Sequence, residues 1–315
     1  MGSPQFAVPS LEALHASHHE IVAVVTQPDR PGGRSLRIRP PAIKVAAHAC
    51  GIPVFQPQTT RTPEFLKVIR AFHPDVLVVV AYGEILRRNL LEVPPRGAVN
   101  LHASLLPKYR GAAPVAWAIL NGERETGVST MMMSEAMDAG PILLQASCPI
   151  HPSETTETLT RKLAVLGAPL LSRTIDLLEK NECVPYPQDV SGATFAPKLK
   201  KQDGWINWDK KADWISRQIS AFNPWPGSFS NFHGSLTKFW VAHPGEDTTT
   251  MEPPGTIVHV LKSSLVVACG QQTVLHVMEL QPENRPRMTA ADFVHGFHVH
   301  AGQQFAGMSA QASDS

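Results

Sequence analysis

Short apolar runs alternate with amphipathic stretches of helical length through the first half of the chain. Five runs rich in β-branched residues have the length of strands, at 21–26, 75–80, 98–102, 127–132 and 142–146. Between them lie stretches with helical spacing, at 10–17, 43–50, 63–72 and 113–121. Continuous apolar strands are typical of parallel sheets that helices cover on both faces. The alternation therefore predicts an α/β fold with a doubly wound, mostly parallel, Rossmann-like sheet.

A change of pattern near residue 181 predicts a boundary between two domains. Before it, five leucines mark one face of a long helix, at positions 159, 163, 166, 170 and 178. After it, a proline-rich stretch has no periodicity, and then short strands bounded by Gly and Pro predict a small OB-like β-barrel. We expect a catalytic domain at 1–181, a linker at 182–203, a barrel domain at 204–306 and a polar tail at 307–315.

The composition indicates a globular protein, because 43% of the 315 residues are hydrophobic and 17% are charged. A formal net charge of +1 taken alone argues against a nucleic-acid partner, since such binding depends on neutralising phosphates. The four cysteines form no C-x-x-C pair, which favours a reducing cytoplasm. The longest apolar run, 76–82, is far shorter than the ~20 residues that span a bilayer. We expect a cytoplasmic protein without a membrane anchor.

The best candidate for chemistry is the segment around Asn100 and His102. In a strand, residues i and i+2 share a face, so both side chains point the same way at the carboxyl end, where open α/β sheets bind ligands. An Asn amide suits a developing oxyanion, and an imidazole oriented by Asp138 can move a proton, which together suit acyl transfer. A buried structural His is the commoner alternative for such a pattern. A triad with Ser104 as nucleophile is disfavoured, because no strained elbow motif accompanies it.

Three motifs of this region resemble those of the folate-dependent formyltransferases. The triplet Asn100-Leu101-His102, the segment Ser104-Leu105-Leu106-Pro107 and the turn Asp138-Ala139-Gly140 match the family's N-x-H, S-L-L-P and D-x-G patterns. Further matches extend over nearly the whole chain, at 26–31, 79–83, 221–227 and 280–282. No dinucleotide, Walker or zinc-protease signature is present in the sequence.

The resemblance implies transfer of a formyl group from 10-formyltetrahydrofolate to the α-amine of methionine carried on initiator tRNA. It makes Asn100, His102 and Asp138 the catalytic residues. The pterin of the folate would be walled by the Ser104–Pro107 segment and by residues between Tyr82 and Leu86. The reaction needs no metal, and the family suggests a monomer. His295, His298 and His300 are close in sequence, but they lack a fourth ligand pattern.

The resemblance also implies that a basic loop at 27–44 contacts tRNA. Five basic residues there stand against Asp29, a local charge of +4, and they are Arg30, Arg34, Arg37, Arg39 and Lys44. Arg34 matches the family's functional loop arginine, and Lys198, Lys200 and Lys201 match its basic linker. Residues 196–240 also carry +4, so the rest of the chain is −7 and the overall neutrality is an average. We therefore expect initiator tRNA as partner, with neither DNA nor a membrane.

Family members usually begin with an apolar strand before a G-T-P-x-F turn. Here Gly2 to Phe6 match the turn, and no strand precedes it. Because parallel strands pair laterally, we expect an unpaired neighbouring edge. Either the natural start lies upstream or the domain is weakened. Two alternatives stay open beside the tRNA enzyme: a formyltransferase acting on a sugar nucleotide, and a truncated, inactive tRNA-binding module.

Overall fold

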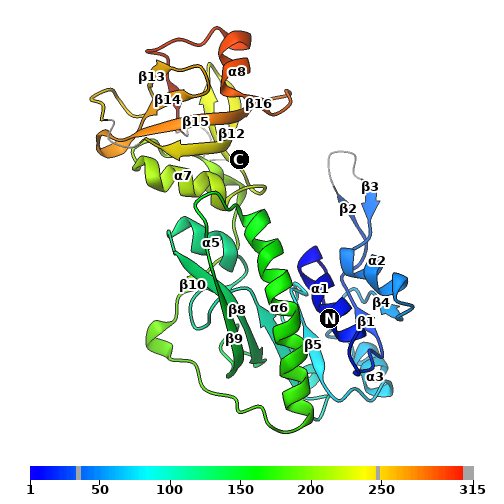
Figure 1. The fold of residues 1–315 in the computed structure, drawn as a ribbon. Coiled ribbons are helices and arrows are strands. Elements are labelled where there is room, and N and C mark those ends of the chain that lie inside the picture. Colours follow the sequence, from blue (N-terminus) through cyan, green and yellow to red (C-terminus); the bar gives the residue numbers. More distant parts are fainter. Residues whose placement is uncertain (33–36, 246–248, 308–315) are drawn as a thin grey trace. The chain divides into compact units, whose positions relative to one another are not determined.

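A computed structural model describes residues 1–32, 37–245 and 249–307 (Figure 1). The chain divides into two compact units. The first consists of Met1–Pro114, Arg124–Ile150 and Thr158–Pro197, and the second of Val115–Glu123, His151–Glu157 and Lys198–Ser315. Residues 182–197, which the sequence assigns to a linker, therefore belong to the first unit.

The first unit is an α/β domain, as the alternating pattern predicts. Its strands are β1 (Val24–Val25), β2 (Arg30–Gly32), β3 (Arg37–Arg39), β4 (Val54–Phe55), β5 (Leu77–Val79), β6 (Ala98–His102), β7 (Arg110–Gly111), β8 (Glu125–Met132), β9 (Ile142–Pro149) and β10 (Phe195–Ala196). Its helices are α1 (Val8–His15), α2 (Ala42–Ala49), α3 (Pro63–Ala71), α4 (Arg88–Leu91) and nearly all of α6 (Thr156–Glu179). Strands β5, β6, β8 and β9 form a four-stranded sheet in that order. The pairs β1–β4 and β5–β6 are parallel, whereas β8 is antiparallel to both of its neighbours.

The sheet of the first unit is interrupted between β1 and β5. In the described chain, Met1 and Gly2 connect the two edges: the Met1 amine donates to the Val78 carbonyl at 2.6 Å, and the Val80 N–H donates to the Met1 carbonyl at 2.8 Å. On the other side, the Gly2 N–H donates to the Val25 carbonyl at 3.0 Å. Met1 and Gly2 thus bridge the edges of β1 and β5 by backbone hydrogen bonds.

Helix α6 packs on β6, the strand that carries Asn100 and His102 (Figure 1). Its fully buried residues include Leu159, Leu163 and Leu171, whereas the predicted Leu166 and Leu170 are half-buried. The buried stripe is displaced because Gly167 lets the helix approach closely: a Cβ at this position would lie 2.7 Å from Leu101 Cδ2. The absence of a side chain at Gly167 thus allows α6 to pack closely on β6.

The second unit is a curled antiparallel sheet with two helices. Its elements are most of α5 (Pro114–Leu120), then α7 (Ala212–Ala221), β11 (Ser228–Phe232), β12 (Ser235–Pro244), β13 (Ile257–Val260), β14 (Leu265–Ala268), β15 (Val274–Pro282), β16 (Met288–Thr289), α8 (Ala290–Phe297) and β17 (Phe305–Ala306). The strand order is β13-β14-β15-β12-β11-β17, and β16 pairs with β15. From the sequence, a helical stretch at 211–221 predicts α7, and short runs at 237–242, 255–261, 264–269 and 273–280 predict the strands from β12 to β15, whereas β11 and α8 are not predicted. This sheet confirms a small barrel-like second domain.

Aromatic side chains fill the core of the second unit. Phe239, Phe293 and Phe305 are almost completely buried, and Trp208 stacks on Phe305 with ring centroids 5.7 Å apart. The Trp208 indole N–H donates to Ser230 Oγ at 3.0 Å. Trp208 is therefore a core residue with a satisfied polar group. Over the residues described, no helix is both long enough and apolar enough to cross a membrane.

The close contact at Gly167 predicts a position intolerant of side chains. Gly167→Leu should overpack the space against buried Leu101 and destabilise the protein by about 1–3 kcal/mol. We expect a lower urea midpoint followed by tryptophan fluorescence or circular dichroism. Val165→Leu is the matched control, because Val165 is 64% exposed on the same helix. An unchanged urea midpoint for Gly167→Leu would show that close packing of α6 on β6 does not require glycine at this position.

Candidate active site

Asn100 and His102 lie at the carboxyl half of β6, between β5 and β8. Asn100 is opposite Val79 of β5 and Met131 of β8, and His102 is opposite Ser129. Both are buried, at 8% and 6% exposure. Their i, i+2 spacing places them on one face of the strand, as the sequence predicts. Among the residues that the structure describes, Asn100 has no hydrogen-bond partner for its side-chain amide, so this donor is free for a ligand.

The imidazole of His102 is held from both sides. Its Nε2 lies 2.9 Å from the carbonyl oxygen of Tyr109. A carbonyl can only accept, so Nε2 carries a proton in this arrangement. Its Nδ1 lies 3.7 Å from Asp138 Oδ2, which is ion-pair distance but longer than a hydrogen bond. Asp138 therefore faces the other ring nitrogen, Nδ1.

Asp138 is fixed in a tight turn by groups far away in sequence. It adopts a left-handed backbone conformation, φ 48°, and its Oδ2 accepts the Gly111 N–H at 2.8 Å. The Gln188 amide donates to the carbonyl oxygens of Asp138 and Gly140, both at 2.8 Å. Backbone strain of this kind persists only where the surroundings over-determine it. The hydrogen bonds of Gln188 and Gly111 supply that determination.

Gln188 also joins the turn to a buried arginine. Its Oε1 accepts from Arg110 Nε at 3.0 Å and from Arg110 Nη2 at 2.7 Å, and Arg110 is 8% exposed. Next to them, β10 pairs in parallel with β7. Sequence reasoning missed both residues: Gln188 lies in a stretch interpreted as linker, and no local motif marks it. A polar residue in an aperiodic, proline-rich segment was the only available signal.

The segment Ser104–Pro107 is built into the same region by β8 and β9. Ser104 Oγ donates to the Lys108 carbonyl at 2.6 Å, so its hydroxyl stabilises the turn itself. Ser129 Oγ donates to the Ser104 carbonyl at 2.7 Å and accepts the Leu106 N–H at 3.0 Å. Gln145 donates to the Leu106 carbonyl at 2.9 Å. Leu106 is 3% exposed, while Leu105 and Pro107 are half-buried.

Tyr82 and Leu86 follow the end of β5, next to β6. Both are 2% exposed and belong to a core cluster with Val79 and Leu90, whereas Leu106 clusters with Met131 and Ile142. The described contacts thus do not join these two predicted walls of the pterin directly. The Tyr82 hydroxyl is buried without a hydrogen-bond partner in the described chain, and burial, aided by the charge of Glu84, raises its pKa to about 12. It is a neutral phenol at physiological pH.

The predicted basic loop is an antiparallel ribbon of β2 and β3. Arg30 pairs with Arg39, and Gly32 with Arg37. Arg34 lies outside the described residues. Lys44 Nζ contacts both carboxylate oxygens of Asp29, at 3.0 and 2.8 Å, and Gln56 donates to Asp29 at 2.6 Å. Hydrogen bonds from Lys44 and Gln56 lower the pKa of Asp29. Lys44 therefore forms an ion pair with Asp29 at the base of the ribbon, and its charge is largely neutralised there.

The other predicted basic residues lie at the start of the second unit. Lys198, Lys200 and Lys201 are exposed, and Leu199 between them is buried. This alternation directs the three amino groups to solvent.

Potential metal ligands gather at a place that the sequence did not indicate. In the described ranges, His18, His19 and Glu179 are the one group of three such residues with ligand atoms within 4.8 Å of one another. His18 already pairs with Glu179 at 2.9 Å, and His19 with Asp176 at 2.8 Å. The imidazoles of His295 and His300 contact nearby carbonyl oxygens of their own segment.

Comparison with known proteins covers both units. Residues 1–175 match the family model "Formyl transferase", and residues 198–298 match "Formyl transferase, C-terminal domain". The methionyl-tRNA formyltransferase of Trichlorobacter lovleyi is 45% identical over 302 residues, 96% of this chain and 94% of the relative. That of Anaeromyxobacter dehalogenans is 46% identical over 297 residues, 94% of this chain and 95% of the relative.

A solved structure shares the fold at lower identity. It is the N-formyltransferase of Helicobacter canadensis, in complex with folinic acid and dTDP-3-aminofucose. It has a TM-score of 0.64 and 18% identity, over 88% of this chain and 96% of that one. With two family models that together span most of the described chain, and relatives well above 40% identity along nearly its whole length, this chain belongs to the formyl transferase family.

Proposed function

We propose that this protein transfers the formyl group of 10-formyltetrahydrofolate to the α-amine of methionyl initiator tRNA. The proposal rests on the juxtaposition of Asn100, His102 and Asp138 in a chain that aligns with a methionyl-tRNA formyltransferase over 96% of its residues. The enzyme acts in translation initiation, in the cytoplasm. The four cysteines are free thiols, which agrees with a reducing compartment.

The reaction forms a carbon–nitrogen bond and breaks another. The methionine amine attacks the formyl carbon, and the carbonyl oxygen gains negative charge in the tetrahedral intermediate. The unpaired amide of Asn100 donates to this oxygen, and a protonated His102 adds positive charge beside it. The bond from the carbon to folate N10 then breaks. The proton that the amine loses is delivered to N10, completing the transfer.

His102 and Asp138 manage that proton. The Tyr109 carbonyl holds Nε2 in its protonated form, so proton exchange takes place at Nδ1. A small shift in the substrate complex would bring Nδ1 and Asp138 Oδ2, now 3.7 Å apart, to hydrogen-bond distance. Asp138 thus stabilises the imidazolium and orients the ring.

Folate fits the carboxyl ends of β5 and β6. The buried Tyr82 hydroxyl lacks a partner within the described residues, and it remains a neutral donor. A pterin offers the ring nitrogens and carbonyl that such donors bind. Leu86, Leu105, Leu106 and Pro107 supply apolar surface against the flat ring, and Ser104 braces their turn.

The arginines of the ribbon position the tRNA. With Lys44 held by Asp29, the charge left for phosphate contacts comes from Arg30, Arg34, Arg37 and Arg39. Lys198, Lys200 and Lys201 add a second exposed basic segment. This distribution favours tRNA over a sugar nucleotide, whose compact diphosphate needs no such spread of charge. We expect a monomer that binds neither DNA nor a membrane and needs no metal.

The first test is activity on the two kinds of acceptor. Purified protein with 10-formyltetrahydrofolate should formylate methionyl initiator tRNA and leave an aminosugar nucleotide unmodified. Asn100→Ala should lower kcat about 10²–10³-fold through loss of the oxyanion donor. His102→Ala and Asp138→Asn should nearly abolish turnover without unfolding the protein. Activity on the aminosugar alone would overturn the proposal. Binding of tRNA without any transfer would assign the chain to an inactive tRNA-binding module.

Gln188 should act as a positioning residue for Asp138. Gln188→Leu removes both the donation to the turn and the acceptor for Arg110, so we expect kcat to fall about tenfold or more. Gln188→Glu keeps an acceptor for Arg110 but cannot donate to the two carbonyls. If positioning of Asp138 matters, both variants lose kcat and shift its pH dependence, with an unchanged KM for tRNA. Full activity of Gln188→Glu would restrict the role of Gln188 to Arg110.

The ribbon should contribute to the binding of tRNA but not to the binding of folate. Replacing Arg30 and Arg39 together by Glu should raise KM for tRNA about tenfold or more, with a weaker salt dependence and an unchanged KM for folate. Lys67→Glu is the matched control, since Lys67 is an exposed cation on α3, outside the ribbon. Equal effects of both changes would mean that general charge, not the ribbon, attracts the tRNA.

A further inference from the structure

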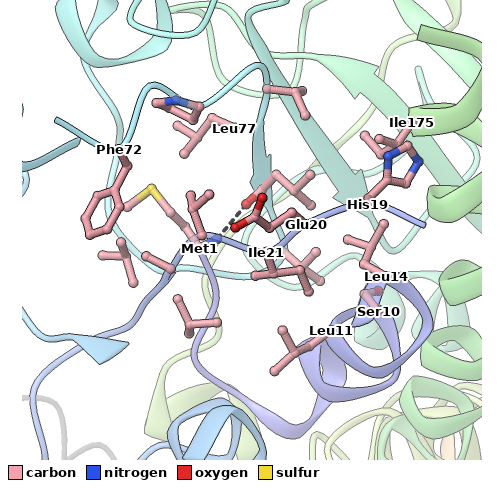
Figure 2. A pocket seen from close by; sticks show the side chains of 18 of the residues that line it. Met1, Ser10, Leu11, Leu14, His19, Glu20, Ile21, Phe72, Leu77 and Ile175 are labelled. Atoms are coloured by element: carbon pink, nitrogen blue, oxygen red, sulfur yellow. Dashed lines mark hydrogen bonds between the residues drawn. The ribbon is translucent and has the colours of Figure 1, made fainter. Parts of the chain in front are cut away.

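Two histidines and two carboxylates form a cluster that joins the loop after α1 to the end of α6. His18 and His19 lie between α1 and β1, and Asp176 and Glu179 lie in the last turn of α6. The Nε2 atom of His18 is 2.9 Å from Glu179 Oε2, and that of His19 is 2.8 Å from Asp176 Oδ1. In Figure 2, His19 lies beside Ile175 of α6, where both residues line a pocket. The proposed formyl transfer makes no use of these four polar side chains.

The ligand atoms of His18, His19 and Glu179 converge on one small region. All three lie within 4.8 Å of one another, and the two imidazole rings are 4.1 Å apart between their centroids. Asp176 and Glu179 are three residues apart on a helix, so they share a face. In a tetrahedral zinc site with bonds of about 2.0–2.1 Å, neighbouring ligand atoms are about 3.3 Å apart. Small side-chain rotations therefore bring the cluster to the spacing of such a site.

The charge and the chemistry of the cluster suit a divalent transition metal. With both imidazoles neutral, the carboxylates of Asp176 and Glu179 give a charge of −2, which one divalent cation balances. Imidazole and carboxylate together are typical ligands of zinc, whereas Mg²⁺ and Ca²⁺ prefer oxygen ligands alone. The hydrogen bond with His18 lowers the pKa of Glu179, so this carboxylate is ionised. The four side chains are between 16% and 61% exposed, so an ion from solution can reach them.

Hydrogen bonds hold the main chain of both ligand segments. The Ser17 hydroxyl donates to the Leu14 carbonyl at 2.7 Å and accepts the His19 N–H at 3.2 Å, which fixes the loop to the end of α1. At the end of α6, Arg96 Nη2 donates to the Glu179 carbonyl at 3.0 Å. An ion therefore meets ligands whose backbone is already ordered, which lowers the entropic cost of binding.

We propose that His18, His19 and Glu179 bind one divalent transition-metal ion of the Zn²⁺ type, with Asp176 placed to supply a fourth ligand. The ion takes the place of the protons between the two Nε2 atoms and their carboxylates, and each ring then carries its proton on Nδ1, as a neutral imidazole ligand. His18 and Glu179 are 161 residues apart in sequence, so the ion cross-links distant parts of the first unit. Its role is to stabilise the fold.

The test uses the whole protein, stripped of metal with a chelator and then titrated with ZnCl₂ near neutral pH. Calorimetry should show a single tight site. With free Zn²⁺ at about a hundredfold excess over its Kd, we expect Tm to rise by about 3 °C or more, as linkage predicts for a ligand of the folded state. MgCl₂ at the same concentration should leave Tm unchanged. Equal stabilisation by Mg²⁺ would mean that the carboxylates alone attract cations, and would overturn the proposal.

Matched substitutions identify the ligands. His18→Gln and Glu179→Gln should each weaken Zn²⁺ binding about tenfold or more and remove most of the rise in Tm. His48→Gln and Glu182→Gln make the same changes at exposed positions outside the cluster, and they should leave Zn²⁺ binding unchanged. The metal-free Tm of all four variants should stay close to that of the wild type, because exposed ion pairs contribute little to stability.

Unchanged Zn²⁺ affinity in His18→Gln would place the ion at other histidines and sink the proposal. Equal losses in all four variants would do the same, since they would reflect general charge and not coordination. Formyl transfer plays no part in these readouts, so they are independent of the proposed function.

Discussion

The fixed turn at Asp138 is the constraint on which the rest of the site depends. A carboxylate in a left-handed backbone conformation faces a buried imidazole, and neither group would keep this position alone. The Gly111 N–H and the Gln188 amide hold the turn, while the Tyr109 carbonyl holds the ring. All three contacts come from the chain between β6 and α5 or from residues just before β10. His102 and Asp138 are therefore held by two backbone groups and by the Gln188 side chain.

The strand beneath this turn is supported from the other side by α6. Leu101 lies between Asn100 and His102 in sequence and points the opposite way, against Gly167. The distance between α6 and β6 at Gly167 therefore also affects where the side chains of Asn100 and His102 lie. A core contact and a functional contact share the same three residues of β6, so neither can change without the other.

The sequence predicted those parts of the site that depend on local spacing. Asn100 and His102 share a face because the period of a strand is two, and residues 98–102 form β6 with the expected bounds. Gln188 and Arg110 were not predictable in this way, since their contact joins positions 78 residues apart. The leucine face of α6 was displaced for a related reason: leucine spacing indicates a buried side, but only packing reveals that Gly167 belongs at its centre. The charge count of the ribbon already included Asp29, but only the folded chain shows that Asp29 pairs with Lys44.

The pairing of β10 with β7 extends the first unit beyond α6, to Pro197. Gln188, Thr194 and β10 all contact residues 107–112, and Thr194 Oγ1 accepts the Tyr109 N–H at 2.9 Å. The proline-rich stretch after α6 therefore packs against residues 107–112 and is more than a connection between units. Exchange of domains between relatives of this enzyme would have to keep residues up to Pro197 with the first unit. A junction placed at the end of α6 would separate Asp138 from the Gln188 amide that holds its turn.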